Sequence, residues 1–457
     1  MAENSTRRSS RTDRLVEERA REFFGFLRCP ACGGRLIPPN DGSHFFKSAD
    51  LRCEGCRETF AIKNYIPRML PPRLAETWRK VTTGSGESTR EGEAASAREW
   101  FLASLGIDPS RVVETPGSRK LWKDIAYLRR SVRSSRLNED DLYEFIAMWG
   151  ARGMAPRYKR IVADQLFGER HATDYERYED VLLRVAINVL LQDAQLVLIE
   201  MGSGVGRYLV QYASCASSDK NAARQYRNAF RAMYAPESLP NAANLRMLVG
   251  IDFEERMLRS ANTWMNQTNL SAAIRSGFVS QIQGSIQDVP LAVEHSLFGQ
   301  VTKLVCVMFQ TIGNQLTEAH RVHVIRKAWQ LARPSGVLIL SAFNGETFDS
   351  QGVPYYESIQ PSVGKPIFMD AATFVSEKGI YSKWMMPLEL EKTCHKAGIR
   401  SPLILTTKNL AVFPHYDRYI PTDNQAGLKN RALLAIAATS KSQMAALKEA
   451  LSQRHAR

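Results

Sequence analysis

Short apolar runs recur along the C-terminal half of the chain, and helical stretches separate them. The runs are LVLIE at 196–200, MLVGID at 247–252, KLVCVMF at 303–309 and GVLILSAF at 336–343. Each run has the length of a strand and is nearly continuous in apolar residues, as strands buried on both faces are. Strands that alternate with helices are typical of βαβ units, so the pattern predicts an α/β fold with a parallel sheet covered by helices.

The N-terminal half has a different pattern. Residues 99–180 carry apolar residues at helical spacing in WFLASL, KLWKDIAYLRR and DLYEFIAMW. Residues 82–98, TTGSGESTREGEAASAR, have the Gly, Ser, Thr and charge content of a linker. The chain is therefore divided into a basic arm (1–26), a cysteine-bearing unit (27–71), a linker with a helical domain (72–180), an α/β domain (181–423) and a basic helical tail (424–457).

Composition narrows the class of protein. The 457 residues are 44% hydrophobic and 24% charged, which is typical of a globular protein of several domains and excludes collagen, a wholly disordered chain and a disulfide-stapled miniprotein. No apolar run approaches the ~18 residues that cross a bilayer, and MAENSTRRSS has no apolar signal core, so we expect a cytoplasmic protein without membrane contact. A net charge of +14 favours anionic partners, nucleic acid first.

Four of the seven cysteines form two CxxC pairs, Cys29 with Cys32 and Cys53 with Cys56. Each pair can turn two thiolates toward one ion, and two pairs make a tetrahedral four-sulfur site of the kind that zinc prefers. Because protein ligands fill all four positions, the spacing predicts a structural zinc rather than a catalytic one. A redox CxxC, an iron–sulfur cluster and coincidence are the alternatives.

The residues around these cysteines, LRCPACGGRL and LRCEGCRETFAIKNYIPRML, resemble the small zinc-ribbon family that activates tRNA, rRNA and protein methyltransferases. The shared features are both cysteine pairs, the strand-like TFAI and the closing IPRML. The resemblance covers residues 27–70. It implies a structural or docking module and no chemistry by the ribbon itself.

A glycine-rich turn follows the first apolar run, in VLIEMGSGVGRY at 197–208. Glycines let the backbone turn sharply and let a ligand approach the main chain without meeting a Cβ. A dinucleotide fingerprint needs Gly-x-Gly-x-x-Gly, but the required third positions hold Arg207 and Leu209. A P-loop is excluded as well, because no Gly-Lys-Ser/Thr follows.

This string resembles the first motif of Rossmann-like S-adenosylmethionine-dependent methyltransferases. The resemblance spans roughly 181–420 and implies a seven-stranded Rossmann-like sheet with S-adenosyl-L-methionine as cofactor. It also places a ribose-binding acid at the end of GIDF, where a carboxylate can accept hydrogen bonds from both hydroxyls. The residues it implies for the cofactor site are Glu200, Gly202, Ser203, Gly204 and Gly206 in the turn, Asp252 and Phe253 after the second strand, Ser285 and Ile286 at the adenine edge, and Phe309 after the fourth strand.

Two features depart from that family. About thirty extra residues, near 214–243, separate Gly206 from Asp252, where about twenty in all are usual. An inserted helical lobe explains the excess, and a misassigned Asp252 is the alternative. The adenine-side position of the family often holds an acid, whereas here it holds Ser285, with Asp288 three residues later.

The methyl acceptor is not specified by these motifs. No Asn/Asp-Pro-Pro-Tyr string is present, and Cys306 within its apolar strand is interpreted as core. The turn at 311–314, Thr-Ile-Gly-Asn, looks similar to turns in methyltransferases of small-molecule amines, with a plain β-turn as the alternative. His320, His323, Tyr355, Tyr356 and Trp384 are interpreted as structural residues rather than as a base or pocket wall, and no catalytic base is assigned.

A competing prediction is an RNA enzyme. Residues 120–136, KLWKDIAYLRRSVRSSR, form a basic stretch with interleaved Trp122 and Tyr127, which can track phosphates and stack bases. A solvated basic face is the simpler interpretation. The sequence favours methyl transfer to a nitrogen or oxygen of a small molecule or peptide over a tRNA or rRNA substrate, with a non-catalytic scaffold as a further alternative. The oligomeric state is not predicted.

Overall fold

The computed structural model describes residues 16, 18–37, 47–84, 86–151, 174–190, 195–216, 244–267, 269–292, 301–406 and 432–452. The insert predicted near 214–243 falls outside them from residue 217 to residue 243, and so do residues 1–15 of the basic arm. Among the described residues, no helix is both long enough and apolar enough to span a membrane.

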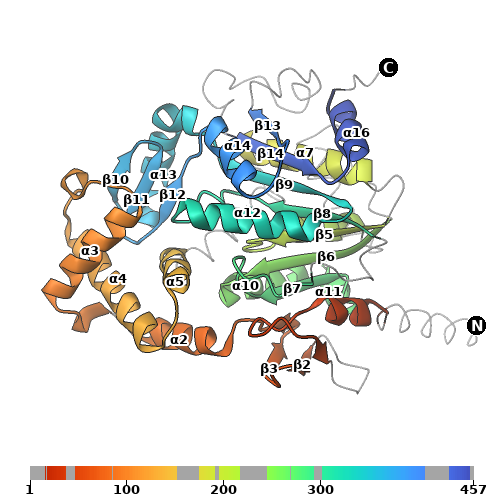
Figure 1. Cartoon of the computed structure of the whole chain (residues 1–457), viewed down its shortest axis with the longest axis horizontal. Helices are drawn as coiled ribbons and strands as arrows, with labels where there is room; N and C mark the ends of the chain where they lie inside the picture. Colours follow the sequence, from red (N-terminus) through yellow and green to blue (C-terminus); the bar gives the residue numbers. More distant parts are fainter. Residues whose placement is uncertain are drawn as a thin grey trace, which may run out of the picture.

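A seven-stranded sheet forms the centre of the molecule (Figure 1). Its first five strands in chain order are parallel, and the last strand runs antiparallel between its two neighbours. The strand order is β13-β14-β9-β8-β5-β6-β7. The predicted Rossmann-like α/β fold is therefore confirmed. The strands are β5 (Leu196–Met201), β6 (Leu245–Asp252), β7 (Val279–Gln283), β8 (Thr302–Val307), β9 (Gly336–Phe343), β13 (Leu403–Thr406) and β14 (Ala432–Ala438).

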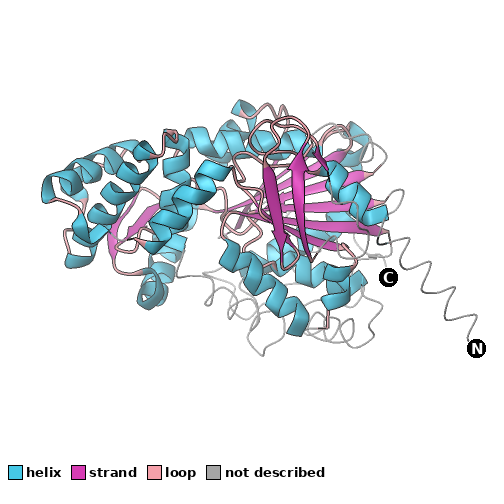
Figure 2. Ribbon diagram, turned by 90° about the horizontal axis from the view of Figure 1, so that it is seen from below, coloured by secondary structure: helices cyan, strands magenta, loops and turns pink. Residues whose placement is uncertain are grey.

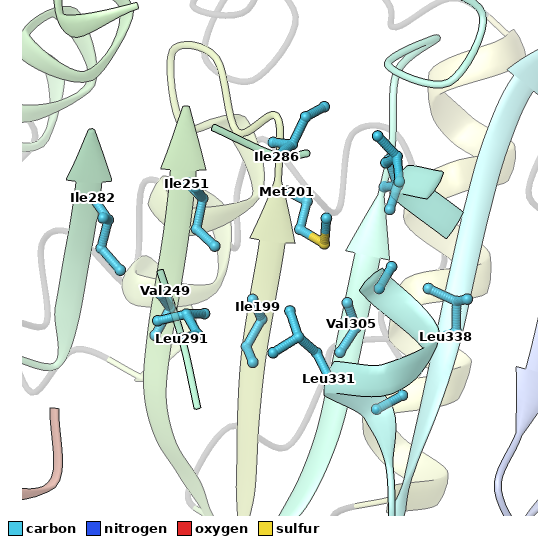
Figure 3. Packing of buried hydrophobic residues seen from close by; sticks show 14 of the residues in the cluster. Ile199, Met201, Val249, Ile251, Ile282, Ile286, Leu291, Val305, Leu331 and Leu338 are labelled. Carbon is cyan, nitrogen blue, oxygen red and sulfur yellow. The ribbon is translucent and has the colours of Figure 1, made fainter. Parts of the chain in front are cut away.

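Helices cover both faces of the sheet, and Figure 2 shows the layers edge-on. One face packs against α7 (Asp174–Leu190), α8 (Arg207–Ala216), α10 (Glu255–Gln267), α11 (Ser271–Arg275) and α16 (Lys441–Ser452). The other face packs against α12 (Glu318–Ala332) and α14 (Pro387–Lys396). Ile199, Val249 and Val305 belong to this second face, where Leu331 of α12 lies beside Ile199 and Val305, and Leu291 lies beside Val249 (Figure 3). Burial on both faces explains why the strands are almost entirely apolar.

The basic helical tail predicted from residue 424 onward is wrong in part. Residues 432–438 form β14, which lies inside the sheet and pairs with β9 over its whole length. The sequence ALLAIAA is rich in alanine, which is a strong helix former, so local propensity favoured a helix. Burial between two strands overrides that propensity. The α/β domain therefore extends past residue 423, and α16 follows β14 and packs on the sheet.

The predicted linker at 82–98 is also wrong. Its first residues end α2 (Pro72–Thr83), and its second half begins α3 (Glu91–Ser104). Ala94 and Ala97 are buried with Phe101 at helical spacing. The helical domain predicted to follow is present, and its remaining helices are α4 (Pro116–Ser134) and α5 (Glu139–Ala151).

A small antiparallel sheet extends the helical domain (Figure 1). It is inserted after β9 and α13 (Val353–Val363), and its buried Ile367, Phe368 and Val375 share a core with α2 to α5. The segment that holds β10 to β12 is thus part of the α/β domain in sequence but packs with the helical domain. The strands are β10 (Pro366–Asp370), β11 (Thr373–Ser376) and β12 (Tyr381–Lys383).

The cysteine-bearing unit forms a four-stranded antiparallel sheet, ordered β1-β2-β3-β4. It lies against the edge strand β7, where Arg68 makes a parallel bridge with Gln283 and Met69 N–H donates to Gln283 O at 2.7 Å. Its apolar residues belong to the same core as the second face of the large sheet. The unit therefore covers an edge that would otherwise expose unpaired backbone. Its strands are β1 (Leu36–Ile37), β2 (Ser48–Cys53), β3 (Thr59–Lys63) and β4 (Ile66–Pro67).

Candidate functional site

The glycine turn joins β5 to α8 at the carboxyl edge of the sheet. Gly202, Gly204 and Gly206 have φ of 74°, 52° and 72°, a region that only glycine adopts without strain. Gly202 N–H and Ser203 N–H both donate to Ile251 O, at 2.8 and 3.0 Å, which ties the turn to β6. A methyl group added at Gly204 would meet no atom within 4 Å, so the turn is open at that residue.

Asp252 ends β6 directly beside this turn. Its Oδ2 accepts the Gly204 N–H at 2.8 Å and its Oδ1 accepts the Glu254 N–H at 2.9 Å. Burial raises the pKa of Asp252 to about 6, although the two N–H bonds oppose that rise. Asp252 therefore lies beside the glycine turn, even though residues 207–251 separate the two in the sequence.

Glu200 lies at the end of β5 under the glycine turn and is only 4% exposed. Its Oε2 has no hydrogen-bond partner among the described residues. Burial raises the pKa of Glu200 well above its usual value, Glu179 raises it further, and Arg207 opposes the rise. A buried carboxylate oxygen without a donor is costly, so this position suits a ligand that brings a donor or a positive charge.

Glu179 was missed by the sequence analysis. It comes from α7, is fully buried, and accepts hydrogen bonds from Tyr208 OH at 2.5 Å, Phe309 N–H at 2.8 Å and the Ser341 hydroxyl. Arg207 lies 3.9 Å away. Glu179 thus joins the helix after the glycine turn to the ends of β8 and β9. One signal could have found it, since it shares a helix face with the buried Leu182, Leu183 and Ala186, where an acid is out of place.

The turn after β8 has an uncommon backbone. Phe309 and Gln310 are consecutive non-glycine residues with φ of 50° and 65°, a conformation that costs on the order of 1–3 kcal/mol per residue. The Gln310 side chain holds it, donating to Lys383 O at 2.8 Å and accepting from Phe343 N–H at 2.5 Å. The next residue, Thr311, packs over Gly202. The turn is therefore fixed against the glycine turn, at the edge where α/β sheets bind ligands.

The loop after β7 lies beside Asp252, whose carbonyl oxygen accepts the Gly284 N–H at 3.0 Å. Ser285 and Ile286, predicted at the adenine edge, are both largely buried there. Phe253 is 4% exposed, and its ring lies 5.4 Å from Trp78 and 6.0 Å from Phe145 of the helical domain. The helical domain therefore packs on the carboxyl end of β6, next to Asp252.

The four predicted zinc ligands converge. The sulfur atoms of Cys29, Cys32, Cys53 and Cys56 all lie within 4.8 Å of one another, with Cys29–Cys56 at 3.5 Å and Cys32–Cys53 at 3.4 Å. These distances exceed the ~2.05 Å of a disulfide and are near the ~3.8 Å edge of a tetrahedron with 2.3 Å Zn–S bonds. The donor set therefore fits a tetrahedral metal.

Several other residues considered in the sequence analysis are buried or already have hydrogen-bond partners. Cys306 is fully buried in β8, and burial raises the pKa of its thiol well above the usual value. His320 Nε2 lies 2.7 Å from Asp140 Oδ1, and His323 Nε2 lies 2.8 Å from Gln287 O. Trp384 Nε1–H donates to Tyr356 OH at 2.9 Å within the core.

The basic helix proposed for RNA is α4, and several of its groups are already engaged. Trp122 is 3% exposed. Lys123 and Arg130 pair with Glu91 and Glu93 of α3 at 2.5 and 2.8 Å. Trp122, Lys123 and Arg130 thus contribute to packing against α3, whereas Lys120 and Arg133 are exposed.

Comparison with solved structures finds distant likenesses. No family model matches the chain, and no curated protein matches it. Among solved structures, the chain is similar to the CcbJ methyltransferase of Streptomyces caelestis (14% identity, 57% of this chain and 95% of that one, TM-score 0.34). It is also similar to a possible exported protein of Bordetella parapertussis (14% identity, 76% of this chain and 96% of that one, TM-score 0.37). A third likeness is to a methyltransferase of Thermotoga maritima described as a possible histamine N-methyltransferase (16% identity, 63% of this chain and 100% of that one, TM-score 0.30). With scores this low, none of these likenesses bears on substrate or mechanism.

Proposed function

We propose that the protein is an S-adenosylmethionine-dependent methyltransferase. The observation that carries this proposal is the 2.8 Å hydrogen bond between the open glycine turn at Gly204 and the carboxylate of Asp252. A nucleoside with a ribose diol and a flexible cationic tail needs an acceptor for the diol next to a backbone free of side chains. This turn and this carboxylate provide both.

The residues present fit the whole cofactor. Asp252 would accept from the two ribose hydroxyls, and the backbone of Gly202–Gly206 would border the tail. Glu200, with its buried unpartnered oxygen, would face the positive charge of the amino acid end. Ile286 would lie against the adenine. When bound, S-adenosylmethionine supplies an electrophilic methyl group on a sulfonium.

The chain's own contribution is then alignment and exclusion of water. The strained turn at Phe309–Gln310 and the network around Glu179 fix the carboxyl ends of β8 and β9, where an acceptor would enter. Around the glycine turn, the described residues Glu179, Glu200 and Asp252 are acidic and Arg207 is basic. This charge distribution favours a neutral or cationic acceptor, such as an amine of a small molecule or peptide, over the phosphates of RNA.

We also propose that Cys29, Cys32, Cys53 and Cys56 bind one structural zinc ion. The convergence of four sulfur atoms on neighbouring hairpins supports this assignment. The metal would stabilise the unit that covers the edge of β7 and would take no part in the reaction.

Calorimetric titration with S-adenosylhomocysteine tests the cofactor assignment. Saturable binding with one site per chain is the expected result, and the absence of heat would leave only the scaffold alternative. Titration with bulk tRNA at several salt concentrations tests the RNA alternative, because phosphate contacts would make the affinity fall steeply with salt. We expect no saturable tRNA binding.

A further inference from the structure

Three parts of the chain that are far apart in sequence meet around one pocket of about 310 Å³. The cysteine-bearing unit supplies Arg68, α2 of the helical domain supplies Arg79, and α10 of the α/β domain supplies Arg256 and Arg259. We call it the arginine pocket after these four residues. Like charges repel, so four guanidinium groups around one pocket are unfavourable unless anions neutralise them.

The carboxylates of the arginine pocket neutralise only part of its charge. Glu254 and Glu255 are the acids among the described residues that line it, and four arginines against two glutamates leave a charge of +2. Oε1 of Glu255 alone accepts from Arg68 at 2.5 Å and from Arg259 at 2.6 and 2.8 Å. Glu254 is 5% exposed, and its Oε1 accepts the backbone N–H of Arg256 at 3.1 Å. Both carboxylates are thus already engaged within the protein.

The guanidinium groups of Arg79 and Arg256 have no such partner. Within the described part of the chain, neither group forms a hydrogen bond or an ion pair, and both residues are exposed. Glu76, on the same helix as Arg79, pairs with Lys80 at 2.8 Å instead. Arg68 adds a further donor, because its Nε is buried and has no hydrogen-bond partner among the described residues. A buried donor without a partner is costly, so the pocket suits a ligand that brings acceptors.

The charge and the donors of the arginine pocket favour a phosphate group. A phosphate ester carries a charge of about −1.5 to −2 at pH 7, which matches the surplus of +2, whereas a single carboxylate would neutralise only half of it. Phosphate oxygens also accept the paired N–H groups of a guanidinium. Leu70, Ala75 and Trp78 form an apolar part of the wall, which would contact a small organic group attached to the phosphate.

The arginine pocket is separate from the edge where a methyl acceptor would enter. Gln283 at the end of β7 and Glu254 after β6 line it, whereas β8 and β9 lie on the other side of β5 in the strand order. It nevertheless borders the proposed cofactor site. Gln283 Nε2 donates to Phe253 O at 3.3 Å, and Glu254 N–H donates to Asp252 Oδ1 at 2.9 Å. A ligand in this pocket would therefore lie next to the cofactor site without being the methyl acceptor.

We propose that the arginine pocket binds a phosphate dianion, either free or as the ester of a small molecule. The ligand would join the cysteine-bearing unit, the helical domain and the α/β domain, because each of them provides at least one of the four guanidinium groups. The proposal depends on these arginines and not on the proposed function, so either can fail without the other.

Calorimetric titration of inorganic phosphate and of phenyl phosphate into the full-length protein tests the site. Ionic strength is held constant with sodium chloride, so that general screening of charge is equal throughout. The wild type should bind one phosphate per chain saturably. Tighter binding of phenyl phosphate would assign the pocket to an ester, because the ring would contact Leu70 and Trp78. Equal or tighter binding of inorganic phosphate would assign it to the free ion.

Arg79→Gln and Arg256→Gln should each weaken the phosphate affinity by about 10-fold or more, because each removes charge-assisted hydrogen bonds. Arg119→Gln is the matched control. Arg119 is exposed on α4 and does not line the pocket, and its replacement lowers the net charge by the same amount. It should change the affinity by less than about 2-fold.

Thermal melting without phosphate checks that each variant folds. A wild type without saturable phosphate binding would overturn the proposal. Arg79→Gln and Arg256→Gln variants that lose no more affinity than Arg119→Gln would overturn it as well, because the binding would then follow from net charge and not from this pocket.

Discussion

The amide of Gly204 donates a 2.8 Å hydrogen bond to Asp252 Oδ2, although the two residues are 48 positions apart and belong to different βα units. Parallel pairing of β5 with β6 makes this possible, because it brings Glu200 opposite Gly250 and so brings the two strand ends to one edge. The contact joins the backbone of the glycine turn to the carboxylate at the end of β6, and the proposed cofactor site depends on it.

Replacing Asp252 by Asn should weaken S-adenosylhomocysteine binding by about 10- to 100-fold. An amide of the same shape loses the charge-assisted bonds to the ribose diol, which are worth about 1.5–3 kcal/mol. Calorimetric titration measures the change. The matched control is Asp288→Asn on the exposed loop surface, where a change below about 2-fold is expected. Equal affinity of wild type and Asp252→Asn would contradict the ribose assignment.

Binding should also depend on pH through Asp252. The pKa of this carboxyl is raised from 3.8 to about 6 in the folded protein, so its contribution to stability falls as pH rises between these values and is constant above them. Binding of the diol needs the ionised form. The affinity for S-adenosylhomocysteine should therefore rise between about pH 5 and about pH 7 and then level off. Titrations across that range should show the step in the wild type and not in Asp252→Asn.

Comparing Gly204→Ala with Gly106→Ala distinguishes loss of ligand space from backbone strain. Gly204 has φ of 52° and Gly106 has φ of 67°, and an added methyl group would meet no atom within 4 Å at either. Alanine should therefore cost both sites a similar stability, about 1–2 kcal/mol. Only Gly204→Ala should also weaken cofactor binding, because its methyl group would occupy ligand space. Melting curves and titrations of both variants are the measurements, and equal affinities would contradict the site.

Glu179→Gln should destabilise the protein by about 1–3 kcal/mol. The NH₂ group of the glutamine would face hydrogen-bond donors from which the Glu179 carboxyl now accepts, so at least one buried donor would lose its partner. Arg207 would also lose the anion at 3.9 Å. Chemical denaturation measures the loss, and the exposed Glu346→Gln provides a control that should change stability by less than about 0.5 kcal/mol. A stable Glu179→Gln variant would mean that the network around β8 and β9 does not depend on this charge.

The sequence alone was sufficient where the signal is local. Strand ends, the three glycines and Asp252 could be placed because apolar runs and turn residues report the backbone directly. The pairing of residues 432–438 with β9 and β13 could not be predicted. The local sequence ALLAIAA favours a helix, and it forms a strand because it is buried between two other strands.

Glu179 was missed for a related reason. It belongs to no motif, and its partners Phe309 and Ser341 are more than a hundred residues away. Residues whose role arises from tertiary contacts leave at most a weak local signal, such as an acid on a buried helix face.

Metal in the cysteine cluster should order the loop that follows β7 and carries Ser285 and Ile286. The cysteine-bearing unit holds this loop at both ends, through Met69 N–H to Gln283 O at 2.7 Å and Arg28 N–H to Pro290 O at 2.9 Å. Arg28 directly precedes Cys29, so loss of the metal would weaken the Arg28–Pro290 hydrogen bond before the Met69–Gln283 one. Chelation, or a Cys53→Ser variant, should therefore raise hydrogen exchange in residues 284–292 while α12 stays protected.

Metal analysis and exchange measured by mass spectrometry on the same samples decide this prediction. The wild type should contain about one zinc per chain, and returning zinc after chelation should restore protection of the loop. Cys394→Ser is the control, because Cys394 is buried in α14 outside the cluster. A Cys53→Ser variant with full metal content would refute the four-thiolate site. Unchanged exchange in the metal-free protein would show that the strand contacts alone hold the loop, since the two hydrogen bonds would then persist without the ion.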